Sequence, residues 1–242
     1  MNTNELLNWT WFELNFQWFG LAGGIILLFL LFGTDKLRND KTVSRWKDYT
    51  WLSWAGLVAY LLHNVEEFGI DLYGHSHGFP ISIGQLLGTV KPDGNIPDGL
   101  LFAMVNVPAF WLVSPIASLL SRKYPLTGLT VYSIISINIL MHVGSFFGQG
   151  YNSGLFTATF VFLPLCIWVF YSCFGKDRLP RKGILFLVAT GILMHIILMA
   201  GMFAYTYDKI SYPMSVSIEA LNSFLLLGLI YMYEKYLYKR PK

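Results

Sequence analysis

Long runs of mostly apolar residues recur along the whole chain of 242 residues. Each run is about 20 residues long, which is the length that an α-helix needs to cross a hydrocarbon core of roughly 30 Å. The composition agrees, because only 13% of the residues are charged, against about 25% in ordinary soluble domains. The sequence therefore predicts an all-α fold, a polytopic membrane helical bundle of about seven transmembrane helices. The predicted segments are Glu13–Gly33, Thr50–Gly69, Leu100–Leu120, Leu126–Phe147, Gly154–Phe174, Gly183–Tyr205 and Met214–Tyr233.

Basic residues lie almost entirely in alternate loops between these segments. Of the 17 lysines and arginines, all but Lys91 and Lys209 fall in one set of loops. By the positive-inside rule this set faces the cytoplasm. We therefore expect a multi-pass protein of the cell (inner) membrane, with its N-terminus outside and its C-terminus cytoplasmic. The basic loops are Thr34–Asp48, the loop with Arg122 and Lys123, Lys176–Lys182 and the tail Lys235–Lys242.

The chain shows no long linker and no low-complexity tract, so we expect a single transmembrane domain over residues 1–242. The longest loop, Ile70–Gly99, contains a short apolar stretch, Phe79–Leu87, that we expect to form a re-entrant or surface helix. Loops of this length are often lids. The net charge of +3 reflects the basic loops, so the expected partner is the lipid bilayer and no nucleic acid is expected. The oligomeric state is left open.

One histidine and two adjacent carboxylates, His63, Glu66 and Glu67, stand at the end of the second apolar run. Charged groups in or near hydrocarbon lose hydration unless they find a partner, a metal or a water-filled cavity, so such residues are functional candidates. Positions i, i+3 and i+4 share one face of an α-helix. The spacing is similar to the H-x-x-E-H zinc motif, whose outer residues bind the metal and whose Glu is the base. By this analogy we expect His63 and Glu67 to be metal ligands and Glu66 to be the general base.

Other polar residues of the predicted membrane segments gather in the same outer half of the bundle. Of these, His142 is the expected third ligand, and His195 is expected to replace or supplement it if the sixth helix is close. We expect Asn138, Asn152 and Glu219 to be accessory residues. The cofactor predicted from these ligand types is a divalent metal, zinc in the first place. Iron is the alternative, because mixed histidine and carboxylate ligands in a helical bundle also suit di-iron chemistry.

Four parts of the chain carry a further pattern. They are YLLHNVEEF at Tyr60–Phe68, Phe79-Pro80, His142 and YNSGL at Tyr151–Leu155. Together they resemble the HXXEE family of small bacterial integral membrane proteins, over roughly His63 to Pro164, and we place an HXXEE-like core at about residues 50–175. The family is named for its motif, which a further histidine and a Pro-Gly-containing turn accompany, and Ser153 stands where the proline is expected. The resemblance implies a shared site in a membrane enzyme of undefined function.

Two classes of function fit these residues. The first is a metal-dependent membrane enzyme, a hydrolase whose hydrophobic or amphipathic substrate, a lipid, isoprenoid or peptide, enters from the outer leaflet. The second is a transporter or channel in which Glu66, Glu67, His142 and His195 relay protons or bind a cation. A relay should continue toward the cytoplasmic half, and below His195 we find no chain of ionisable residues in any predicted helix, which favours the enzyme. A non-catalytic membrane binding protein is the third alternative.

Overall fold

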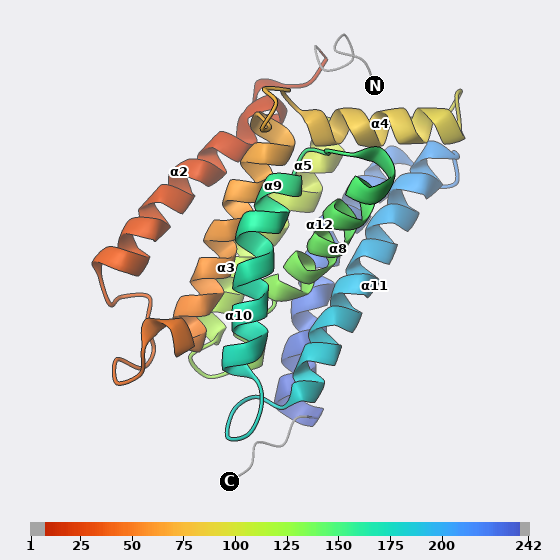
Figure 1. Ribbon diagram of the computed structural model, residues 1–242. Coiled ribbons are helices and arrows are strands. Elements are labelled where there is room, and N and C mark those ends of the chain that lie inside the picture. The colour runs from red at the N-terminus through yellow and green to blue at the C-terminus, as the bar shows by residue number, and fades with distance from the viewer. Residues whose placement is uncertain (1–7, 238–242) are drawn as a thin grey trace.

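The computed structural model describes residues 8–237 and is a bundle of long helices (Figure 1). Within these residues, six helices are long and apolar enough to cross a membrane. Their bounds are Trp11–Gly33, Gly99–Leu120, Val131–Gln149, Leu155–Cys173, Arg181–Thr206 and Tyr212–Leu237. The predicted all-α fold is confirmed, and the chain is a multi-pass membrane protein.

The remaining predicted segment, Thr50–Gly69, forms a helix but is not one of these six. It consists of α3 (Tyr49–Asn64) and a π-helical turn, η2 (Val65–Gly69). At about 1.5 Å per residue, residues 49–69 are long enough to cross a core of about 30 Å. The polar motif residues His63, Glu66 and Glu67 lower the hydropathy of this segment, and all three side chains are buried. The described part of the chain thus has six candidate spans and this further long, buried helix, which is roughly consistent with the predicted number of about seven.

Two of the long helices change their winding at prolines. Pro108 begins the π-helix η3, and Pro164 is the second residue after the end of the π-helix η4. Proline lacks the N–H that would continue the α-helical hydrogen bonds, and wide π turns are often found where a helix is so interrupted. The first of these helices consists of α5 (Gly99–Val107), η3 (Pro108–Val113) and α6 (Ser114–Leu120), and the second of α9 (Leu155–Thr157), η4 (Ala158–Phe162) and α10 (Leu163–Cys173).

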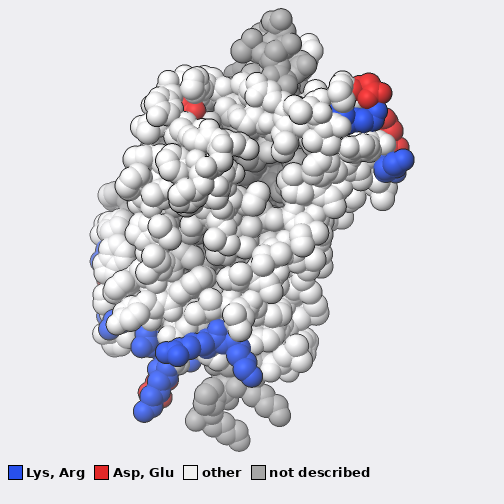
Figure 2. Space-filling view, turned by 45° about the vertical axis from the view of Figure 1, so that its right-hand side comes forward, with Lys and Arg blue, Asp and Glu red and all other residues white. Residues whose placement is uncertain are grey.

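Successive long helices run in alternating directions, so the loops gather at two ends of the bundle (Figure 1). At one end, α4 (Gly78–Val90) lies across the bundle, which confirms a helix in the stretch Phe79–Leu87. Lysines and arginines collect at the other end, and the broad surface between is almost free of charge (Figure 2). We name these the α4 end and the basic end; Lys239, Arg240 and Lys242 lie outside the described residues. The other elements are α2 (Trp11–Gly33), η1 (Arg45–Lys47), α7 (Pro125–Gly128), α8 (Val131–Gln149), α11 (Arg181–Thr206), α12 (Tyr212–Met232) and η5 (Tyr233–Leu237).

Helix α3 lies at the centre of the bundle and positions the motif. A Cβ added at Gly56 would lie 2.6 Å from Cγ1 of Val131, so glycine permits the close approach of α3 and α8. The hydroxyl of Tyr132 donates to the carbonyl of Leu52 at 2.7 Å, which fixes the two helices along their length. Both of these side chains are fully buried. The first half of α3 is therefore held against the start of α8.

Candidate metal centre

The side chains of His63, Glu67 and His142 meet inside the bundle, where η2 and α8 approach each other. Nε2 of His63 lies 3.3 Å from Oε1 of Glu67, and Nε2 of His142 lies 3.2 Å from the same oxygen. All three side chains are buried, and one ligand atom of each lies within 4.8 Å of the others. Tetrahedral zinc with bonds of about 2.0 Å has ligand atoms about 3.3 Å apart. The three ligands predicted from the sequence therefore lie together and could hold one metal ion.

The proton on His63 is placed by its neighbour Thr157. The Thr157 hydroxyl donates to Oε2 of Glu66 at 2.6 Å, so its oxygen accepts from Nδ1–H of His63 at 2.7 Å. A neutral imidazole with its proton on Nδ1 has a lone pair on Nε2. This Nε2 is fully buried and makes no hydrogen bond with any residue that the structure describes. The free lone pair of His63 is thus directed at Glu67.

Asn152 places the ring proton of His142 in the same way. The amide nitrogen of Asn152 donates to the backbone carbonyl of His142 at 3.1 Å, which orients the side-chain amide. Its Oδ1 therefore accepts from Nδ1–H of His142 at 2.6 Å. The lone pair on Nε2 of His142 consequently also faces Glu67. Such partners on the second ring nitrogen are typical of metal-binding histidines, because they fix the tautomer and the orientation of the ring.

Two nitrogen lone pairs and a carboxylate oxygen thus converge on one buried point. These groups repel one another unless a metal ion or a proton on Nε2 lies between them, and burial strengthens the repulsion because the surroundings have a low dielectric constant. Two imidazoles and one carboxylate are a donor set that suits zinc, with a fourth position left open. The residues present therefore fit a divalent metal ion with three protein ligands.

Glu66 points away from this centre, although it is the direct neighbour of Glu67. Its carboxylate accepts from the hydroxyl of Tyr151 at 3.0 Å, from the backbone N–H of Phe156 at 3.0 Å, and from both the N–H and the hydroxyl of Thr157. Four donors occupy the lone pairs of both oxygens, and the charge caps the start of the helix Leu155–Cys173. The general-base role expected of Glu66 stays a prediction, and these hydrogen bonds favour a positioning role instead.

The family comparison covers this region of the chain. Residues 54–169 match the family described as "Protein of unknown function with HXXEE motif". Over this segment, which is just under half of the chain, the protein is similar to the HXXEE family. The matched segment contains the motif itself, His142 on α8, and Thr157, which the sequence analysis missed. No curated protein and no solved structure matches the chain.

The turn before α9 packs directly on both histidines of the candidate metal centre. Gly154 has a φ of +102°, and a Cβ there would lie 2.5 Å from Cε1 of His142 and 2.8 Å from Cε1 of His63. Only glycine combines this backbone conformation with the required space. The backbone of the turn therefore holds the two imidazole rings in place from the side of α9.

Ser153 links this turn to the loop that follows η2. Its hydroxyl donates to Asp71 at 2.9 Å, and the backbone N–H groups of Tyr73 and His75 donate to the same carboxylate. Burial raises the pKa of Asp71, but the hydrogen bonds from His75 and Ser153 outweigh it and lower the pKa below its ordinary value. Where an HXXEE turn is expected to have a proline, this chain has a hydrogen-bonding serine that anchors the turn.

The remaining residues singled out by the sequence do not contact Glu67. Nδ1 of His195 lies 2.8 Å from the carbonyl of Gly191, and its Nε2 lies 3.0 Å from Oδ1 of Asn138. His195 is therefore a hydrogen-bonded core histidine, and Asn138 connects it with Tyr60. Glu219 lies on α12 beside Gly201. Of the predicted accessory residues, only Asn152 supports a ligand directly. Thr157 was missed because nothing in its local sequence shows that it meets a residue 94 positions away.

Proposed function

We propose that the chain is a zinc-dependent membrane enzyme, a hydrolase that acts on a hydrophobic or amphipathic substrate. The observation that supports this proposal is the convergence of the Nε2 atoms of His63 and His142 on the carboxylate of Glu67. Three protein ligands with one open position are the pattern of catalytic zinc sites, whereas structural sites have four. Zinc in such a site supplies a Lewis acid for an acyl or phosphoryl oxygen.

The residues around the centre are suited to exclude water from it and to fix its side chains in position. The ring of Phe162 lies 4.5 Å from that of His63, and Phe79 of α4 lies 6.4 Å from His142. These aromatic rings exclude water, which strengthens every charge interaction at the site. We assign Thr157 and Asn152 to orienting the two imidazoles, and Glu66 to orienting Thr157. A lipid, isoprenoid or peptide that reaches the centre from the bilayer at the α4 end is the expected substrate class.

A proton- or cation-coupled transporter is the second candidate, and Glu219 favours it. This carboxylate is buried in α12, and neither oxygen has a hydrogen-bond partner among the described residues. A path for protons or cations from Glu219 toward the basic end is not supported. The next buried carboxylate on that path, Glu234, instead accepts hydrogen bonds from Leu126 and Thr127 at a helix start. The enzyme is therefore the better-supported function.

Metal content tests the proposed centre. The protein is purified in mild detergent without a histidine tag and analysed by plasma mass spectrometry. We expect about one zinc per chain in the wild type, loss of it in His63→Ala and in His142→Ala, and retention in His195→Ala. Iron instead of zinc would indicate redox chemistry in place of hydrolysis, and a metal-free wild type would overturn the proposal. Cobalt reconstitution gives a second readout, because its visible absorption reports a tetrahedral site in the wild type itself.

Activity is then measured on a fluorogenic fatty-acyl ester in the same detergent. We expect hydrolysis that a chelator abolishes and that added zinc restores, and no hydrolysis by Glu67→Gln. From the sequence analogy, Glu66→Gln should keep the metal and lose activity. If Glu66 only positions Thr157, the same variant instead binds zinc more weakly and recovers activity at high zinc. Hydrolysis that survives complete removal of metal would contradict a zinc enzyme.

A further inference from the structure

A second feature is an apolar groove of about 720 Å³ that runs along α3. It lies between α2, α3 and α10, and one face of α3 with Ala55, Val58 and Leu62 forms its back wall. The volume is typical of sites for small organic molecules, which measure about 300–1,000 Å³. None of the three metal ligands lines it, so the groove is separate from the proposed catalytic site.

The two ends of the groove differ in polarity. Phe160 and Leu62 line the end toward the metal centre, whereas Ser44 and Lys47 line the end at the α2–α3 loop. Lys47 is exposed and makes no ion pair with any carboxylate in residues 8–237. Beside it, Trp46 is 43% exposed, as is typical of aromatic residues at the membrane interface. The groove is thus a long apolar slot with one unpaired positive charge at its mouth.

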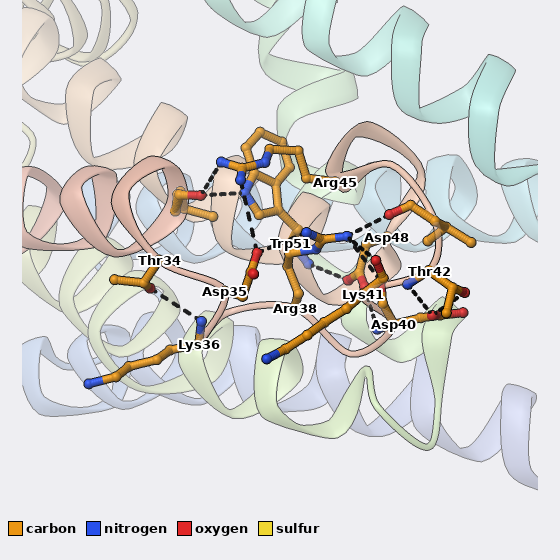
Figure 3. A network of polar contacts seen from close by, with 12 residues as sticks. Thr34, Asp35, Lys36, Arg38, Asp40, Lys41, Thr42, Arg45, Asp48 and Trp51 are labelled. Carbon is orange, nitrogen blue, oxygen red and sulfur yellow. Dashed lines mark hydrogen bonds and ion pairs between the residues drawn. The ribbon is translucent and has the colours of Figure 1, made fainter.

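Hydrogen bonds hold the mouth of the groove in a fixed shape (Figure 3). The guanidinium of Arg45 donates to the carbonyls of Leu31 and Phe32 at the end of α2, at 3.1 Å and 3.2 Å. The indole of Trp51 also donates to the Leu31 carbonyl, at 2.9 Å. On the opposite side, the indole of Trp168 donates to the carbonyl of Trp46 at 2.7 Å. The mouth is therefore organised before anything binds, which reduces the entropy lost on binding.

We propose that this groove binds one anionic glycerophospholipid from the leaflet at the basic end. One acyl chain lies along the apolar face of α3, and the headgroup phosphate pairs with Lys47. The assignment rests on charge complementarity, because the groove pairs apolar walls with a single free cation at the depth of the lipid headgroups. The basic residues of the same loop, including Lys36 and Lys41, add to the attraction for a lipid with net negative charge.

Native mass spectrometry of the delipidated protein in mild detergent tests this site. Phosphatidylglycerol and phosphatidylcholine with identical acyl chains are titrated separately. We expect one saturable phosphatidylglycerol per chain, bound more tightly than phosphatidylcholine. Lys47→Gln should weaken phosphatidylglycerol binding about fivefold, the effect of one basic residue near an anionic surface. Lys176→Gln, at another exposed lysine of the basic end, should leave it unchanged.

A second pair of variants tests the acyl-chain part of the groove. Ala55→Phe fills the back wall and should abolish saturable binding, whereas Ala22→Phe on the exposed surface of α2 should not. Equal binding of the two lipids, or saturable binding that persists in Ala55→Phe, would overturn the proposal. Zinc content is recorded for every variant, so that failure of the lipid site is distinguished from failure of the metal centre.

Discussion

At the scale of single residues, the chemistry of the centre depends on where two protons lie. Thr157 and Asn152 each accept a hydrogen bond from the Nδ1–H of a histidine, so the Nε2 lone pairs of both neutral rings are available for a metal. Partners of this kind contribute to affinity because they fix the ring before the metal arrives. A residue that never touches the metal therefore decides how tightly it is held.

Thr157→Val tests this directly, since it removes the hydroxyl and keeps the shape of the side chain. We expect zinc affinity to fall about 10–100-fold, the usual effect of losing such a partner. Competition with a chromogenic chelator measures the affinity. Thr190→Val is the matched control, because the hydroxyl of Thr190 donates only to carbonyls of its own helix. Equal affinities of the two variants would show that Thr157 does not orient His63.

Asp71 is a second single residue with a testable effect, in this case on the stability of the fold. Its carboxylate accepts hydrogen bonds from Tyr73, His75 and Ser153, and its folded pKa is lowered. A lowered pKa means that its contribution is present above the unfolded value of about 3.9 and is lost as the pH falls through the folded pKa. Asp71→Asn should therefore reduce the free energy of unfolding by about 1–3 kcal/mol at pH 7.

Thermal unfolding in detergent measures this effect across pH. The difference between the wild type and Asp71→Asn should shrink as the pH falls from about 4 through the lowered folded pKa of Asp71, below which both side chains are neutral. Asp177→Asn, at an exposed position without an ion pair in residues 8–237, serves as the control and should unfold like the wild type. A difference that stays constant down to the lowest pH would show that the charge of Asp71 is not the cause.

At the scale of elements, the winding of η2 separates the roles of two neighbouring carboxylates. If residues 63–67 formed a regular α-helix, His63, Glu66 and Glu67 would lie on one face. In the structure Glu67 faces the histidines, while Glu66 caps α9 through Phe156 and Thr157. The sequence alone does not predict this division, because the donors that fix Glu66 lie about 90 positions further along the chain.

The same cap recurs at the basic end of the bundle, which supports a positioning role for Glu66. Glu234, also on a π-helical turn, accepts from the backbone N–H groups of Leu126 and Thr127 and from the Thr127 hydroxyl. No histidine takes part there. Two buried glutamates thus cap two helix starts in the same way, and only the cap at Glu66 extends through a threonine to a metal-binding ring.

The turn before α9 gives a prediction at this scale. Gly154→Ala introduces strain at a φ of +102° and places a methyl group against both imidazole rings, whereas Gly150→Ala introduces strain at a φ of +76° with nothing within 4 Å. Both changes should cost about 1–2 kcal/mol of stability. Only Gly154→Ala should also lose zinc, as measured by metal content of the folded fraction. Zinc retained in Gly154→Ala would show that the rings can move without losing the metal.

At the scale of the whole molecule, apolar run length predicted six of the long helices, because lipid-exposed surface must be apolar over the full width of the bilayer. The seventh, Tyr49–Gly69, was recognised despite its polar end. The cluster of His63, Glu67 and His142 was predicted from the same logic, since buried charges need a partner. Composition and spacing did not predict the roles of Thr157, Tyr151 and Asp71, which hydrogen-bond to residues around the centre. These roles depend on tertiary contacts alone.

Membrane orientation is the last prediction, and it follows from the charge at the basic end. The positive-inside rule places that end in the cytoplasm, so the α4 end and the metal centre should face outward. Cysteines are introduced as Asp93→Cys at the α4 end and Lys176→Cys at the basic end; the native Cys166 and Cys173 are buried. A membrane-impermeant maleimide on intact cells should label Asp93→Cys, and Lys176→Cys only after lysis. The reverse pattern would move the substrate entry to the inner leaflet and leave the geometry of the centre unchanged.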